Sequence, residues 1–145
     1  MRKQYKLSIW KFNRKETKNK KPNEMSKKKN NRESQIQQAC VHWFRLQYPD
    51  KVLFAVPNGG ARDPVTGAIL KAEGVMPGVS DLILLYPSGG YHALCIEMKT
   101  DKGRQQPSQI EFQKAVERYK YKYVVCRDID TFVEAIKMYM SESSD

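Results

Sequence analysis

The sequence predicts an α/β protein in which a mixed sheet is flanked by helices. Segments of strand length and segments with apolar residues at helical spacing follow one another in the order helix, three strands, helix, strand, helix. The second and third strand segments are apolar on both faces, which is typical of strands that are covered on both sides. A chain of 145 residues is long enough for one domain with its own core.

The first half of this order contains a helix, a strand and a long turn region. A helix is predicted over residues 33–48, where apolar side chains recur at helical spacing and Pro49 ends the pattern. Residues 52–57 have the composition of a strand, and residues 58–67 are mostly turn-forming. A short helix is expected over residues 68–74, because a glycine ends that segment.

The second half begins with a predicted hairpin over residues 81–100, whose turn is centred on Ser88–Gly90. A helix is predicted over residues 109–120, because Ser108 and Glu111 match a capping box. The remaining elements are a strand at residues 122–128 and a final helix at residues 129–140.

The positive charge is concentrated at the N-terminus. Residues 1–32 hold 13 Lys and Arg against 2 Asp and Glu, and the rest holds 13 against 14, so this segment carries essentially all of the net charge of +10. Since it has few apolar residues to bury, we expect a disordered basic arm before a domain at residues 33–145. Its lysines, among them Lys27, Lys28 and Lys29, are expected to add salt-sensitive affinity for phosphate. The alternative is a solvated arm without a dedicated binding geometry.

The three cysteines, Cys40, Cys95 and Cys126, lie singly in apolar stretches, which favours buried reduced thiols over zinc ligands or disulfides. This usage predicts a reducing, cytoplasmic environment. The longest apolar runs have the length of strands and the N-terminus lacks an apolar signal region, so neither a membrane span nor secretion is expected.

Charged residues interrupt the apolar hairpin, with Asp81 at one end and Glu97 and Lys99 at the other. Because side chains alternate along a strand, Glu97 and Lys99 share one face, whereas Ile96 and Met98 point the other way. The predicted turn places Asp81 opposite Glu97 or Met98, at about 5 Å between Cβ atoms. Two carboxylates so close together repel each other unless a proton or a cation lies between them.

This pattern predicts a site for a divalent metal ion, since magnesium prefers hard oxygen ligands, often one or two carboxylates together with water and phosphate. Lys99 is then placed to hold a phosphate oxygen or to lower the pKa of an attacking water, so the combination predicts phosphodiester hydrolysis. The competing interpretation is structural, with Asp81 capping a loop and Glu97 and Lys99 forming a salt bridge at the sheet edge.

Asp81 with Glu97-Met98-Lys99 resembles the D…(D/E)xK signature of the PD-(D/E)XK nuclease superfamily, with Ser80 where the name-giving proline often stands. The segments "VPNGGAR", "LKAEGVMPGVSDLILL" and "CIEMK", followed by a glutamine ten residues beyond the lysine, look like the VRR-NUC family. The similarity runs from about Glu33 to Met138. It implies a restriction-endonuclease-like α-β-β-β-α-β core and a metal-dependent DNA endonuclease.

The resemblance also implies roles for individual residues. Asp81, Glu97 and the backbone carbonyl of Met98 would bind Mg²⁺ or Mn²⁺, and Lys99 would position or activate water. Glu33 matches a helix glutamate that can hold a metal-bound water, and the alternative is a charge favoured by the N-terminus of a helix.

Three further positions match the family pattern or depart from it. Gln109 takes the position of the family glutamine, and its alternative is an ordinary exposed helix residue. Asn58 and Arg62 match a family loop in which Arg62 would grip a phosphate, and a plain turn is the alternative. Family members often have Ser or Thr at the position of Gln106, so Ser108 is expected to cap the helix instead.

The predicted function is cleavage of branched DNA such as Holliday junctions. Small members of the family that stand alone resemble nucleases of branched DNA and Holliday junctions that work as dimers, because two active sites must meet two strands. The resemblance thus implies a homodimer and a role in DNA repair in a bacterial or phage-infected cytoplasm. The alternatives are a flap, nicking or restriction-like nuclease and a non-catalytic DNA-binding protein. The presence of Asp81, Glu97 and Lys99 together argues against a pure binding protein.

Overall fold

The computed structural model describes residues 24–57 and 63–142, and of residues 24–30 the backbone alone. The elements in this part of the chain are α1 (Glu24–Gln47), β1 (Leu53–Ala55), α2 (Pro64–Ala72), β2 (Leu82–Leu84), β3 (Leu94–Met98), α3 (Pro107–Arg118), β4 (Lys122–Cys126) and α4 (Ile129–Ser141). Their order and the mixed sheet confirm the predicted α/β class.

The sheet has the strand order β1-β2-β3-β4, with antiparallel pairs β1/β2 and β2/β3 and a parallel pair β3/β4. Within the hairpin, Leu82 pairs with Ile96 and Leu84 with Leu94. One step further along this register, Asp81 stands opposite Glu97. The strand that carries Glu97 is therefore an inner strand, and every residue of β3 is buried.

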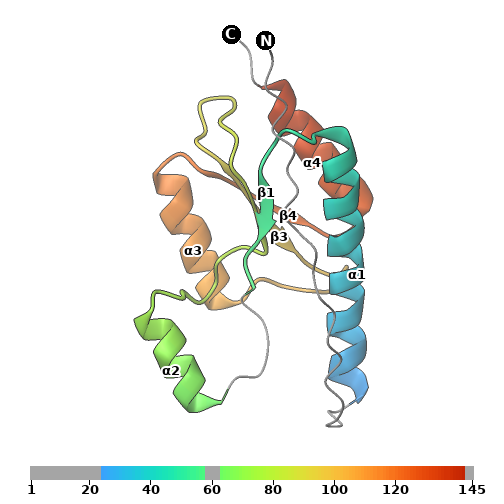
Figure 1. The fold of residues 1–145 in the computed structure, drawn as a ribbon. Coiled ribbons are helices and arrows are strands. Elements are labelled where there is room, and N and C mark those ends of the chain that lie inside the picture. Colours follow the sequence, from blue (N-terminus) through green and yellow to red (C-terminus); the bar gives the residue numbers. More distant parts are fainter. Residues whose placement is uncertain (1–23, 58–62, 143–145) are drawn as a thin grey trace, which may run out of the picture.

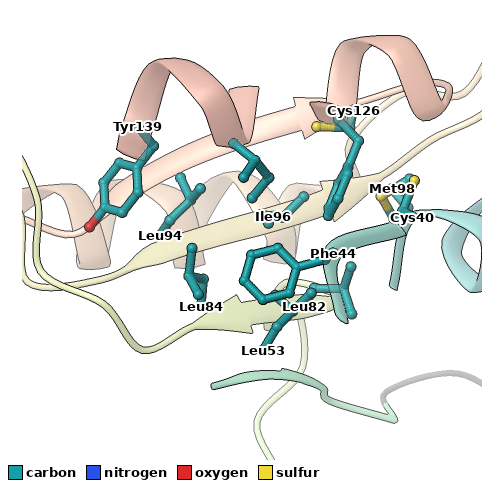
Figure 2. Close-up of a cluster of buried hydrophobic side chains, with 12 residues drawn as sticks. Cys40, Phe44, Leu53, Leu82, Leu84, Leu94, Ile96, Met98, Cys126 and Tyr139 are labelled. Carbon is teal, nitrogen blue, oxygen red and sulfur yellow. The ribbon is translucent and has the colours of Figure 1, made fainter. Parts of the chain in front are cut away.

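Helices cover both faces of the sheet, with α1 and α4 on one face and α3 on the other (Figure 1). The hydrophobic core fills the space between the sheet and α1 and α4 (Figure 2). Its buried members are Cys40, Phe44, Leu53, Leu82, Leu84, Leu94, Ile96, Met98, Cys126, Phe132, Ile136 and Tyr139. Leu94, Ile96 and Met98 of β3 face this core, and side chains alternate along a strand, so Glu97 points to the opposite face, which α3 covers.

The first helix differs from its prediction in its start and in one of its apolar positions. It begins at Glu24, nine residues before the predicted start, so its first turns belong to the segment that was predicted as an arm. Residues 24–32 include almost no apolar side chain, and apolar periodicity therefore cannot reveal this part of the helix. Near the end of the predicted helix, the apolar side chain of Leu46 departs from the buried pattern, because it is 66% exposed.

The N-termini of α2 and α3 also lie elsewhere than predicted. Asp63 caps α2 by accepting a hydrogen bond from the backbone N–H of Thr66 at 3.0 Å, so this helix begins before residue 68. The predicted capping of α3 by Ser108 is wrong, because Gln106 is the N-cap residue and Pro107 follows it. A proline is favoured in the first helical turn, where its missing N–H has no partner to lose.

Two predictions about the whole chain can be compared with the described residues. All three cysteines are buried and unpaired. None of the helices within residues 24–57 and 63–142 combines the length and the hydrophobicity that crossing a membrane requires.

Candidate active site

Asp81 is held at the end of β2 and reaches across to β3. Its Oδ2 accepts a hydrogen bond from the backbone N–H of Met98 at 2.7 Å. Just before it, the buried hydroxyl of Ser80 donates to the carbonyl of Leu82 at 3.2 Å and fixes the chain that leads into the strand. The interaction of Asp81 is thus between strands and does not cap a loop.

Glu97 is fully buried and accepts hydrogen bonds from three side chains. Its Oε1 lies 2.8 Å from Nζ of Lys99 and also accepts from Nε2 of Gln109. Its Oε2 accepts from the hydroxyl of Tyr123 at 3.3 Å. The salt bridge of the competing interpretation is therefore present, but it does not lie at the sheet edge, because Glu97 belongs to the inner strand β3 and Lys99 directly follows this strand.

Burial raises the pKa of both carboxyl groups, so each holds its proton more firmly than an exposed carboxyl group does. The pKa of Glu97 is raised to about 7, mainly by burial and also by the negative charge of Asp81, against the hydrogen bond from Lys99, which lowers it. Burial also raises the pKa of Asp81, against the hydrogen bond from Met98 and the charge of Lys99. A cation between the two groups would stabilise their ionised forms.

The donor set fits a hard divalent ion that takes its remaining ligands from water and substrate. Among the described residues, no group of three or more His, Cys, Asp and Glu side chains gathers around one point. The set therefore consists of the two facing carboxylates, Asp81 and Glu97, to which the Met98 carbonyl was predicted to add. Magnesium is usually bound in this way, by one or two carboxylates, several waters and phosphate oxygens.

Glu33 lies beside this pair and does not join it. Its Oε1 accepts a hydrogen bond from the backbone N–H of Thr100 at 3.2 Å, one residue after Lys99. The alternative interpretation of Glu33 as a charge at a helix N-terminus is wrong, because α1 begins nine residues earlier. Its negative charge contributes to the raised pKa of Asp81.

Gln109 is bonded at both ends of its amide. Oε1 accepts from the backbone N–H of Gln106 at 2.7 Å, and Nε2 donates to Glu97. The N–H at the helix N-cap thereby fixes which end of the amide faces the carboxylate. Gln109 is half-buried and is not an ordinary exposed helix residue.

Several predicted DNA contacts cannot be compared with the structure. Asn58 and Arg62 lie outside the described residues. Lys27, Lys28 and Lys29 lie in α1, where the description covers the backbone and not their side chains.

Three residues of the site were missed at the level of sequence. Tyr123 pairs with Cys95, which lies two residues before Glu97, so Tyr123 and Glu97 are on the same face of the sheet. A prediction of the register between β3 and β4 would have identified Tyr123 as a neighbour of Glu97. Arg127 follows β4 and donates from Nη1 to the carbonyls of Thr100, Asp101 and Gly103 at 2.6, 3.3 and 2.9 Å. Contacts to backbone carbonyls leave no signal in a sequence.

The third missed residue is Gly78, which lets the loop before Asp81 approach the first turn of α3. A Cβ atom at this position would lie 2.2 Å from the carbonyl oxygen of Ser108, and the backbone has φ +82°. This contact places the strand end with Asp81 against the helix turn that carries Gln109.

A mixed sheet that holds two facing carboxylates and an adjacent lysine defines a protein of the nuclease type. The family model of the VRR-NUC domain matches residues 31–128, about two thirds of the chain, and the chain belongs to the VRR-NUC family. Membership confirms the predicted family and implies a nuclease-type function that acts on DNA. Nuclease domains of this kind generally use divalent metal ions.

A solved structure of a VRR-NUC domain protein has the same fold, with a TM-score of 0.65 and 24% sequence identity. The similarity covers 77% of this chain and 90% of that chain. A search of the curated proteins found no match.

Proposed function

We propose that this protein is a DNA endonuclease that depends on Mg²⁺ or Mn²⁺ and hydrolyses phosphodiester bonds. The observation that supports it most is the fully buried Glu97, which stands opposite Asp81 and lies 2.8 Å from the ammonium group of Lys99. Asp81 and Glu97 hold the ion, together with the Met98 carbonyl. The bound ion supplies polarisation of the phosphate and a lower pKa for the attacking water.

Lys99 and the residues around Glu97 have separate tasks in this proposal. Once Glu97 serves as a ligand, Lys99 is free to hold a phosphate oxygen and to stabilise the charge that develops there. Gln109 and Tyr123 donate to Glu97 and keep its carboxylate oriented. Glu33, which is anchored to the N–H of Thr100, holds a water beside the ion.

The proposed substrate is branched DNA, such as a Holliday junction, cut by a homodimer in DNA repair in a bacterial or phage-infected cytoplasm. The resemblance to small family members that stand alone supports this choice. Asn58 and Arg62, which follow β1 in the sequence, and Lys27, Lys28 and Lys29 of α1 would contact the phosphate backbone. The alternative is a flap, nicking or restriction-like nuclease, which would use the same residues.

The test compares labelled four-way, forked, flapped, duplex and single-stranded DNA, each with Mg²⁺, with Mn²⁺ and with chelator. We expect metal-dependent cutting that is fastest on a branched substrate, and a dimer by light scattering. Fastest cutting of plain duplex would contradict the branched substrate. Binding without cleavage of any substrate, in either metal, would contradict the enzyme and favour a DNA-binding protein.

A further inference from the structure

A cluster of exposed rings lies at the end of β4 that is farther from Asp81 and Glu97. It consists of His92 and Tyr121, whose rings are in contact, and of Tyr119, which lies two residues before Tyr121 in the same turn, and we call it the ring cluster. Tyr119 is 67% exposed and Tyr121 is 37% exposed. The rings of His92 and Tyr121 lie 5.5 Å apart at 60°. The cluster has no place in the proposed cleavage site.

The turn that ends α3 builds this cluster. The N–H of Tyr121 donates to the carbonyl of Val116 and the N–H of Lys120 to that of Glu117, both at 3.1 Å, which defines a Schellman turn. Lys120 occupies the left-handed position with φ 60°, the only residue other than glycine with positive φ in the described part of the chain. Its carbonyl accepts from the N–H of His92 at 2.8 Å and ties that residue to the turn.

A lysine at this position is a costly choice, because glycine adopts the left-handed conformation with far less strain. In the sequence it stands between two exposed tyrosines, and Arg118 precedes them. Neither Arg118 nor Lys120 forms an ion pair with any carboxylate of the described residues. The surface therefore combines ring faces with free positive charge.

Unpaired nucleotides are the ligand that this combination fits. Bases of a single strand stack on aromatic rings, while their phosphates are attracted by neighbouring cations. A duplex keeps its base faces stacked on one another and offers only phosphates to such a surface.

The register of the sheet gives the distance from the ring cluster to the cleavage site. Glu97 pairs with Val125, and Tyr121 precedes Val125 by four residues, which corresponds to about 13 Å along a strand. A few nucleotides of one DNA strand span this distance. One substrate molecule can therefore reach both places.

We propose that the ring cluster, with Arg118 and Lys120, binds the bases of an unpaired DNA strand next to the duplex that is cut. This inference deepens the proposed function and rests on it for the identity of the ligand. It predicts that a fork, a flap or a junction with unpaired nucleotides binds more tightly than a fully paired junction.

The experiment measures binding by fluorescence anisotropy with the full chain and chelator, so that no cleavage occurs. The probes are a thymidine oligonucleotide and an abasic oligonucleotide of the same length. We expect the variant Tyr119→Ala/Tyr121→Ala to lose at least about tenfold in affinity for the thymidine probe and little for the abasic probe. Because no charge is removed, the dependence on salt should stay unchanged.

Two controls separate stacking from a change in the fold. Tyr119→Phe/Tyr121→Phe keeps both rings and should keep the affinity for the thymidine probe. Met138→Ala removes a side chain of α4 that is 57% exposed and should have no effect. Should the double alanine variant fold poorly, Tyr119→Ala alone removes the more exposed ring and is expected to cost about threefold or more.

Equal affinity of the wild type for both probes would overturn the proposal, as would undiminished thymidine binding by the alanine variants. The result is independent of catalysis. If no DNA is cut but binding depends on the rings, the nuclease proposal fails and the strand-binding proposal stands. If DNA is cut but binding does not depend on the rings, the nuclease proposal stands and the strand-binding proposal fails.

Discussion

Three side chains carry the proposed chemistry, and two of them, Asp81 and Glu97, can be changed with little change in shape. We expect Asp81→Asn, Glu97→Gln and Lys99→Ala each to slow cleavage at least about 100-fold, a loss of about 2.7 kcal/mol of transition-state stabilisation, while DNA binding persists. The first two variants remove a negative charge and keep the volume. The measurement is single-turnover cleavage of the preferred substrate, and an undiminished rate for any one variant would remove that residue from the mechanism.

The buried carboxylate Glu97 also links stability to pH in the absence of metal. Burial raises its pKa from 4.5 to about 7, so the folded chain binds this proton more tightly than the unfolded chain. The stabilisation is therefore complete below pH 4.5 and is lost as the pH rises towards 7. The raised pKa of Asp81 acts in the same direction.

We accordingly expect the melting temperature of the metal-free protein to fall between about pH 5 and pH 8, and to fall less for Glu97→Gln, which has no proton to lose. Lowered pKa values, such as that of Asp128 through its hydrogen bonds from Thr131, act at lower pH and do not interfere. Added Mg²⁺ should raise the melting temperature at about pH 8 in the wild type more than in the variant. A flat profile in the wild type would contradict the assignment.

Arg127 fixes the loop that follows Lys99, through three backbone carbonyls and without any ion pair to a described carboxylate. We expect Arg127→Gln to lower the free energy of unfolding by about 1–3 kcal/mol, because partly buried carbonyls lose a charged donor. Cleavage should also slow, since Thr100 in this loop anchors Glu33. Urea denaturation and single-turnover rates test both effects, and an unchanged unfolding midpoint would show that solvent replaces the guanidinium.

At the scale of elements, the contact between the loop before β2 and α3 depends on one glycine. Gly78→Ala would bring a Cβ atom to 2.2 Å from the Ser108 carbonyl at a positive φ, so the loop must move. We expect a loss of about 1–3 kcal/mol in stability and slower cleavage, because Asp81 shifts relative to Gln109.

Gly67→Ala in α2 is the matched control, since its Cβ atom meets nothing within 4 Å. This variant should be neutral or stabilising by up to about 1 kcal/mol, because alanine favours a helix. Equal melting temperatures for the two variants would mean that the loop before Asp81 adapts freely.

The elements were predictable to the extent that apolar patterns define them. The turn of the hairpin predicted its register to within one residue and placed Asp81 opposite Glu97 or Met98. The observed register selects Glu97. The start of α1 was not predictable in this way, because its first nine residues include almost no apolar side chain. The start of α3 depended on Pro107, whose preference for a first helical turn outweighed the capping pattern of Ser108.

At the scale of the whole molecule, the site draws on α1, β2, β3, α3 and β4, and packing brings these elements together. The spacing of residues in the sequence identified only Asp81, Glu97 and Lys99, which lie within one hairpin. Glu33 and Gln109 entered through family resemblance, and Tyr123, Arg127 and Gly78 required the structure, since their partners lie in other elements or in the backbone.

The distribution of charge over the whole chain leads to a test of the N-terminal segment. Residues 1–23 hold nine Lys and Arg against one acidic residue, and their removal keeps all of the described helix α1, Glu24–Gln47. We expect the truncated protein to bind DNA more weakly and with a smaller dependence on salt. The logarithmic slope should fall by about 0.9 for each phosphate that the segment neutralises in the full chain. Cleavage at saturating DNA should stay unchanged.

A second variant tests the lysines within α1 separately. Changing Lys27, Lys28 and Lys29 to glutamine removes three charges and keeps a residue that favours helices. If these lysines bind phosphate, the variant and the truncation should each lower the slope, and their effects should add because they act on different phosphates. Equal DNA affinity and equal salt dependence in the wild type and in both variants would contradict this prediction and would assign DNA binding to the rest of the domain. The net charge of +10 would then affect only the rate at which the protein meets DNA.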